Sequence, residues 1–212
     1  MDQKTLPDEP PPHVFSLIAT FDSDIQRHVL TYLPHDPAHT AELEAKPVRE
    51  LLDIYASWQQ RLVFPCPRRV HQSKALRANP LAANPAHRPG LNALIEKIGR
   101  GEVITPHLSR GILQGYKPAK PDAPKALLKR RDLDLLLNDW GIHHLHVSTK
   151  TDQDGFVERS KALLFAAFQP HDAYLIDLME HGDWTHEHLI EVIARGWPDA
   201  RLVMETQGKR AG

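Results

Sequence analysis

The chain has 212 residues, of which 41% are hydrophobic and 25% are charged, and its formal net charge at pH 7 is −1. These values are ordinary for a globular protein. They exclude a global electrostatic attraction to nucleic acid or to anionic membranes, so binding of either kind needs a local patch of charge. The only cysteine, Cys66, excludes an intramolecular disulfide, and no apolar run approaches the roughly 20 residues that span a bilayer. The acidic, proline-rich start is unlike a signal peptide. We therefore expect a cytoplasmic protein with no membrane partner.

The first part of the chain predicts a tail followed by a helical region. Residues 1–12 combine acidic residues with proline and cannot nucleate a core, so we expect a disordered tail. Prolines recur throughout residues 13–116 and predict short helices that are separated by rigid turns. The clearest helix is expected at 47–62, where apolar residues follow Pro47 at three- and four-residue spacing. Shorter helices are expected at about 22–33, 91–99 and 105–113.

Residues 117–131 have the composition of a basic linker. Lysine and proline dominate this segment, and Asp122 is its one acidic residue. It marks the expected boundary between two parts of the chain. Its cations are Lys117, Lys120, Lys125, Lys129, Arg130 and Arg131.

Residues 132–204 predict a small sheet with a C-terminal helix at about 185–195, and a frayed tail is expected at 205–212. Apolar runs at 142–149, 161–168 and 173–181 read as strands that are joined by short turns. Connections this short imply antiparallel neighbours, because a parallel pairing needs a crossover of about a dozen residues. The predicted fold class is therefore α+β, with a Pro-rich helical N-terminal region followed by a small antiparallel β-meander with flanking helices.

Three histidines within four positions mark the first of these strands, whose sequence is IHHLHVST. Strand side chains alternate between the two faces of a sheet. Leu145 and Val147 therefore define the expected core face, and His144 and His146 are expected on an open opposite face. In the third strand, Asp177 and His181 are expected to share a face with Leu175 and Met179. Pairing in chain order then places His144, His146, Asp177 and His181 on one face, roughly 10 Å apart across the central strand.

This arrangement leaves three interpretations open. Imidazoles beside the cations Arg159 and Lys161 are suited to acid–base chemistry on a phosphodiester, which needs no metal when an RNA 2′-hydroxyl is the nucleophile. A His-x-His pair can instead bind zinc, with Asp177 or His181 as a further ligand. Histidine also suits half-buried strand positions that have no chemical role.

The stretch from 142 to 195 resembles the RelE/ParE-type toxins, a family with a small ribonuclease-like sheet. The resemblance lies in the order of three strands and a helix, in the arginine that leads RSKALLF, and in the His181–Gly182 corner after the third strand. It implies that Arg159 binds phosphate, that His181 is the general acid and that a histidine of the first strand is the base. In this chain the acidic segment DWTHEH stands where the family usually has a lysine-rich segment, and more than a hundred residues precede the sheet.

The predicted function is a metal-independent endoribonuclease of the toxin type, with no cofactor and no metal. Its expected partners are RNA and a regulatory protein such as an antitoxin. One alternative is a non-catalytic interaction module that docks a protein by strand addition and through Trp140, Trp184 and Trp197. A zinc-dependent hydrolase that uses the His-x-His strand is the third hypothesis. The candidate catalytic residues are His144, His146, Arg159 and His181, and the candidate substrate-binding residues are Arg68, Arg69, Lys129, Arg130 and Arg131.

Overall fold

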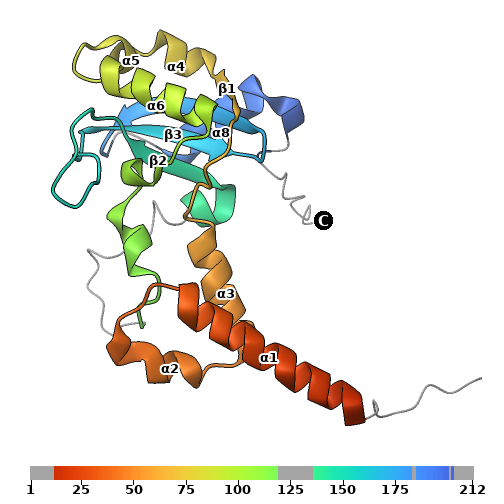
Figure 1. Cartoon of the computed structure of the whole chain (residues 1–212). Coiled ribbons are helices and arrows are strands. Elements are labelled where there is room, and N and C mark those ends of the chain that lie inside the picture. Colours follow the sequence, from red (N-terminus) through yellow and green to blue (C-terminus); the bar gives the residue numbers. More distant parts are fainter. Residues whose placement is uncertain (1–11, 119–135, 183–184, 201, 203–212) are drawn as a thin grey trace, which may run out of the picture. The chain divides into compact units, whose positions relative to one another are not determined.

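The structure is a computed structural model that describes residues 12–118, 136–182, 185–200 and 202 (Figure 1). The tails expected at 1–12 and 205–212 and the basic linker fall almost entirely outside the described residues. The chain divides into two compact units. Unit 1 combines residues 1–59 with 113–119, and unit 2 combines 60–112 with 120–212. This division differs from the predicted one, because residues 60–112 belong with the sheet.

Unit 1 is a small helical bundle closed by a returning segment of chain. Its helices are α1 (Pro12–Tyr32), the short 3₁₀ helix η1 (Pro37–His39), α2 (Thr40–Glu44) and α3 (Val48–Gln59). The returning segment contributes Tyr116, whose backbone N–H donates to Pro34 O at 2.8 Å and whose hydroxyl donates to Glu42. Helix α3 confirms the helix expected at 47–62. The fully buried apolar residues at the centre of this unit are Val29, Leu33, Leu43 and Leu51.

Unit 2 is built on a four-stranded mixed sheet with the order β1-β4-β3-β2. Strands β2 (Ile142–His146), β3 (Ala162–Phe168) and β4 (Asp172–Glu180) form the predicted antiparallel meander. Strand β1 (Arg69–Gln72) was not predicted and pairs in parallel with the start of β4. The α+β class is confirmed, but the sheet is mixed because the chain region before the meander supplies an edge strand.

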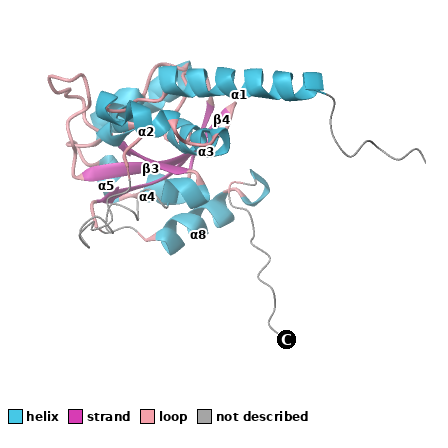
Figure 2. Cartoon of the chain, turned by 90° about the horizontal axis from the view of Figure 1, so that it is seen from below, coloured by secondary structure: helices cyan, strands magenta, loops and turns pink. Residues whose placement is uncertain are grey.

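Helices cover both faces of this sheet. Helices α4 (Lys74–Ala78), α5 (Pro80–Ala83) and α6 (Arg88–Arg100) lie on one side of it in Figure 1. On the other side are a helical segment at 136–140 and α8 (His186–Gly196), which lies against the strands in Figure 2. Helices α6 and α8 confirm the helices expected at 91–99 and 185–195. The helix expected at 105–113 is instead a pair of 3₁₀ turns, η2 (Thr105–His107) and η3 (Arg110–Gln114), and η5 (Pro198–Ala200) follows α8. No described helix is long and apolar enough to cross a bilayer.

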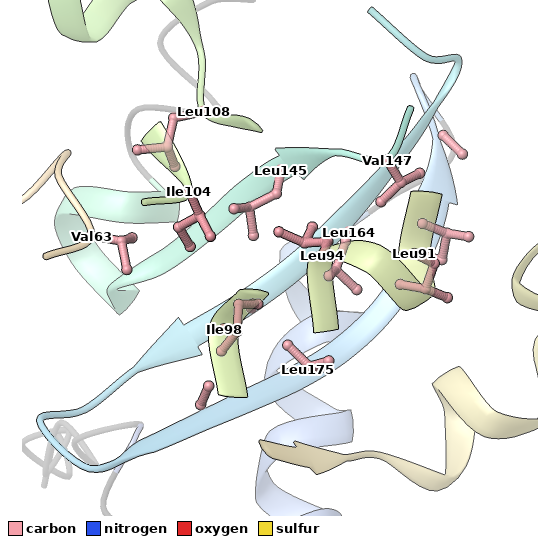
Figure 3. Packing of buried hydrophobic residues seen from close by; sticks show 14 of the residues in the cluster. Val63, Leu91, Leu94, Ile98, Ile104, Leu108, Leu145, Val147, Leu164 and Leu175 are labelled. Atoms are coloured by element: carbon pink, nitrogen blue, oxygen red, sulfur yellow. The ribbon is translucent and has the colours of Figure 1, made fainter. Parts of the chain in front are cut away.

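The two hydrophobic clusters of unit 2 explain why β3 is apolar on both faces. On the α6 side, Leu91, Leu94 and Ile98 pack against sheet residues that include Leu145 and Leu164 (Figure 3). On the α8 side, Leu189 and Ile193 pack with Ile142, Leu163, Phe165 and Ile176. The prediction that β3 is central is confirmed. The prediction of an open face for His144 and His146 is wrong, because the face that they share with Ile142 is covered.

A β-bulge changes the alternation of β4. Phe165 pairs with Asp177 and Ala166 pairs with Leu175, so Ile176 is an extra residue in β4. Leu175 consequently faces α6, although simple alternation assigned it to the face of Asp177. Beyond the bulge, Met179 returns to the α8 side as predicted.

Helix α6 approaches the end of β2 at Gly90. A Cβ atom built at this glycine would lie 2.3 Å from the carbonyl oxygen of Val147. Backbone that is packed this closely cannot accept a methyl group without moving. Gly99, on the exposed side of the same helix, meets only a Val70 methyl group at 3.9 Å.

We predict that Gly90→Ala lowers the free energy of unfolding by about 1–3 kcal/mol, the usual cost of overpacking. Gly99→Ala is the matched control in the same helix, and it is expected to be neutral or to stabilise by up to about 1 kcal/mol. Urea unfolding of the two variants and the wild type measures the difference. Equal stability of the two variants would contradict the close contact at Gly90.

Candidate functional site

A pocket open to solvent lies at the end of the sheet where β3 begins and β4 ends. It has a volume of about 440 Å³. The backbone N–H of His181 donates to Lys161 O at 3.1 Å, which continues the antiparallel pairing of the two strands beyond their ends. Residues that face each other in such a pair project to the same side of a sheet. Lys161 and His181 therefore share a side. The residues that line the pocket are Arg159, Ser160, Lys161, Glu180 and His181.

His146 projects to the same side of the sheet as Lys161 and His181. It pairs with Leu163, which pairs in turn with Met179, two residues before His181. The ring centroids of His146 and His181 are 6.5 Å apart, with an angle of 43° between the ring planes. The sequence-predicted residues Arg159, His146 and His181 are thus brought together, although they come from three separate segments of chain.

The environment of His146 keeps its imidazole neutral. The residue is only 7% exposed, and its Nδ1 atom has no hydrogen-bond partner among the described residues. Burial lowers the pKa of His146 to about 4, and the nearby positive charges of His144 and Arg159 act in the same direction. At neutral pH the ring is therefore unprotonated and able to accept a proton.

His144 precedes His146 by two residue pairs in β2. It is half-buried and stands opposite Phe165, which pairs in turn with Asp177. Its charge lowers the pKa of both His143 and His146. The structure therefore places His144 on the predicted face, farther from the pocket than His146.

Asp177 shares this face as predicted, but its carboxylate is fully engaged in packing. It is 5% exposed and accepts hydrogen bonds from Asn79 Nδ2 at 2.6 Å, from the N–H of Leu178 at 2.8 Å and from His188 Nε2 at 2.9 Å. Three donors satisfy the acceptor oxygens of a carboxylate that is shielded from water. This arrangement ties β4 to α8 and to the α4–α5 segment rather than presenting Asp177 to the pocket.

The predicted substrate-binding arginines lie at the opposite end of β4. Strand β4 has nine residues, so its two ends are roughly 25 Å apart. Arg68 donates to the carbonyl oxygens of Phe64 and Gln169, and Arg69 makes a bidentate pair with Asp172 at 2.9 and 3.0 Å. Both guanidinium groups thus have local structural partners and are separate from the pocket. Lys129, Arg130 and Arg131 lie outside the described residues.

The described part of the chain contains no set of ligands for a metal centre. No group of three or more His, Cys, Asp and Glu side chains there is arranged to hold a metal ion. His144 and His146 are on one strand, but the carboxylate of Asp177 is held by the donors described above. The geometry therefore gives the zinc-dependent alternative no support.

The sequence did not predict the structural contacts of His107 and His188. His107 is 2% exposed, and its Nδ1 lies 2.8 Å from the carbonyl oxygen of His146. His188 carries no motif in the sequence, yet its Nε2 donates to the buried Asp177. Neither contact leaves a local sequence signal, because each joins segments that only the tertiary fold brings together.

Comparison with models of protein families, with curated proteins and with solved structures gave no match.

The buried histidines predict a loss of stability in acid. His143 is 8% exposed, and burial lowers its pKa from 6.5 to about 4, with smaller contributions from the charges of His144 and Arg68. Its ring meets the edge of the Phe168 ring with centroids 5.4 Å apart. Between pH 6.5 and pH 4 the unfolded chain binds a proton at this position and the folded chain does not, so the free energy of unfolding falls as the pH falls.

We expect His143 alone to remove about 2 kcal/mol of stability between pH 7 and pH 5, with His146 adding a similar amount. His143→Phe keeps an aromatic ring against Phe168 and removes the titrating group, so its loss over this interval should be smaller by about 2 kcal/mol. Urea unfolding at the two pH values measures the change. His171→Asn, at an exposed position, is the control and should behave like the wild type. An unchanged pH dependence in His143→Phe would contradict the lowered pKa.

Proposed function

We propose that this protein is a metal-independent endoribonuclease and that it cleaves RNA in the pocket formed by Arg159, Lys161 and His181. One observation carries the proposal. Arg159 and His181 line the same pocket, and the ring of His146 lies 6.5 Å from the ring of His181. A cation and two imidazoles at one site are the groups that phosphodiester transfer needs when the nucleophile belongs to the RNA itself.

The charge of the pocket suits a phosphodiester. Arg159 and Lys161 supply two positive charges, and Glu180 supplies one negative charge. The excess of one positive charge matches the single negative charge of an RNA diester. It also favours the additional charge that develops on the nonbridging oxygens in the transition state. The exposed guanidinium of Arg159 has the fork of donors that pairs with two such oxygens.

The proposed reaction transfers the phosphoryl group within the RNA. A histidine of β2 removes the proton of the 2′-hydroxyl, and the 2′-oxygen attacks the adjacent phosphorus. The bond from phosphorus to the 5′-oxygen breaks, and protonated His181 donates its proton to this leaving oxygen. The products are a 2′,3′-cyclic phosphate and a free 5′-hydroxyl. At the end of the reaction the histidine of β2 carries a proton and His181 has lost one.

Two residues of β2 are candidates for the base. His146 is nearer to His181 and is neutral at pH 7, but a pKa of about 4 makes it a weak base. His144 is half-buried and lies farther along the strand. We assign the role to His146 because its ring lies 6.5 Å from the ring of His181, which lines the pocket. Separate alanine variants of the two residues distinguish them.

The interaction module remains the alternative with a non-catalytic role. Its partner would be a regulatory protein that pairs with the sheet. Strand β2 is at an edge of the four-stranded order, but His107 already donates to the carbonyl oxygen of His146 on this strand. The edge is therefore partly satisfied within the chain, and this favours the pocket over strand addition as the functional feature.

We predict that the purified protein cleaves RNA in the presence of a chelator and leaves 2′,3′-cyclic phosphate ends. His181→Ala should lower kcat by about 100-fold or more, the usual contribution of a general acid. Arg159→Ala should lower kcat/KM by a similar factor, because it removes charge stabilisation in the transition state. His171→Ala is the matched control, since this exposed histidine precedes the opposite end of β4, and it should stay within twofold of the wild type.

The proposal fails if the folded wild type leaves RNA intact, or if His181→Ala cleaves it at the wild-type rate. Intact RNA together with a stable protein complex in cells would favour the interaction module. Stoichiometric zinc in the purified protein, with activity that is lost in chelator, would favour the zinc-dependent hydrolase.

A further inference from the structure

We infer that His107 is a positioning residue that holds the main chain of His146 in place for catalysis. This inference deepens the proposed function and depends on it for its catalytic consequence. Its structural part can be tested without any activity measurement. His107 does not line the pocket, so its effect would be transmitted through His146.

The hydrogen bonds of His107 fix both its tautomer and its charge. Its Nδ1 lies 2.8 Å from the carbonyl oxygen of His146, and its Nε2 lies 3.3 Å from Lys97 Nζ. A carbonyl oxygen only accepts, so Nδ1 must carry the hydrogen. An ammonium group only donates, so Nε2 must offer its lone pair. His107 is therefore a neutral imidazole with its hydrogen on Nδ1.

Burial strengthens this arrangement. His107 is 2% exposed, and burial lowers its pKa below the ordinary value, with the charge of Lys97 acting in the same direction. A hydrogen bond in an environment shielded from water is costly to lose, because neither partner can turn to solvent. A residue of similar size at position 107 therefore cannot replace this contact between η2 and β2 unless it also donates a hydrogen bond to the carbonyl oxygen of His146.

The main chain that follows His146 is held from two further directions. The N–H of Val147 donates to Ser160 Oγ at 3.2 Å, and Ser160 lines the pocket. The carbonyl oxygen of Val147 lies close to Gly90, where there is no room for a side chain. The end of β2 is therefore fixed by side chains and close backbone packing in addition to its pairing with β3.

This support sets the distance between the two proposed catalytic rings. Within the described parts of the chain no group bonds to Nδ1 of His146, so the position of the ring depends strongly on its packing and on its own backbone. If the bond from His107 is lost, His146 is free to shift relative to His181. A displacement of about 1 Å at a reacting group can lower the rate by up to about 100-fold, whereas substrate affinity, which depends on Arg159 and Lys161, is retained.

Two variants of His107 form a matched pair for the test. The amide nitrogen of asparagine takes the place of Nδ1, so His107→Asn can still donate to His146 O. The amide of glutamine takes the place of Nε2, so His107→Gln can contact Lys97 but cannot reach this oxygen. We expect His107→Asn to keep kcat within about threefold of the wild type and His107→Gln to lower kcat by about 10- to 100-fold with KM within twofold.

Imidazole ¹⁵N NMR spectra of the full chain provide the readout that does not need activity. The wild type should show His107 with its hydrogen on Nδ1. The ring signals of His146 should shift in His107→Gln and stay near their wild-type positions in His107→Asn. These spectra decide the positioning role even if the wild type has no ribonuclease activity, so failure of this inference and failure of the proposed function are distinguishable.

A wild-type His107 that carries its hydrogen on Nε2 would overturn the inference. So would unshifted His146 signals in a folded His107→Gln variant, or equal kcat values for the two variants. If His107→Gln does not fold, two other results decide the question: the hydrogen on Nδ1 in the wild type and the retained kcat of His107→Asn. Neither result is expected if His107 does not donate to the carbonyl oxygen of His146.

Discussion

The buried carboxylate of Asp177 is the interaction on which the arrangement of unit 2 depends. It accepts hydrogen bonds from Asn79, from the neighbouring N–H of Leu178 and from His188, and so joins β4 to elements on both sides of the sheet. The carboxylate reaches α8 because Ile176 forms a bulge immediately before it. The same bulge sets the direction of every later side chain in β4 and of His181, which follows the strand. The geometry of the candidate site therefore depends on the extra residue Ile176 and on the buried carboxylate beside it.

The meander and most of its helices could be predicted because their signals are local. Alternation and short turns located β2, β3 and β4, and the apolar spacing of α3, α6 and α8 located those helices. The parallel edge strand β1 escaped prediction because its four residues, RVHQ, show no clear alternation and their partner lies about a hundred residues further along the chain. Pairing over this separation depends on the tertiary fold.

The sequence predicted which histidines share the candidate site, but it did not predict which elements cover them. Strand parity correctly grouped His146 with His181. Strand parity could not show that α8 covers this face. A strand that alternates histidine with leucine has the pattern of a half-exposed strand, and the residues that cover it follow the meander in the sequence. Arg68 and Arg69 were grouped with the site on charge alone, and charge does not reveal that one binds backbone carbonyls and the other binds Asp172. His107 carries no motif at all, since its role is defined by a carbonyl oxygen of another element.

The packing of α6 against β3 and β4 also has a consequence for the order in which the protein can fold during synthesis. Unit 1 is complete once residue 119 has left the ribosome, whereas the apolar side of α6 has no sheet to pack against until β3 and β4 have followed. Leu91, Leu94 and Ile98 consequently emerge tens of residues ahead of their partners. At the usual elongation rate of about 5–20 residues per second, this segment stays uncovered for several seconds, which is long enough for a chaperone to bind it.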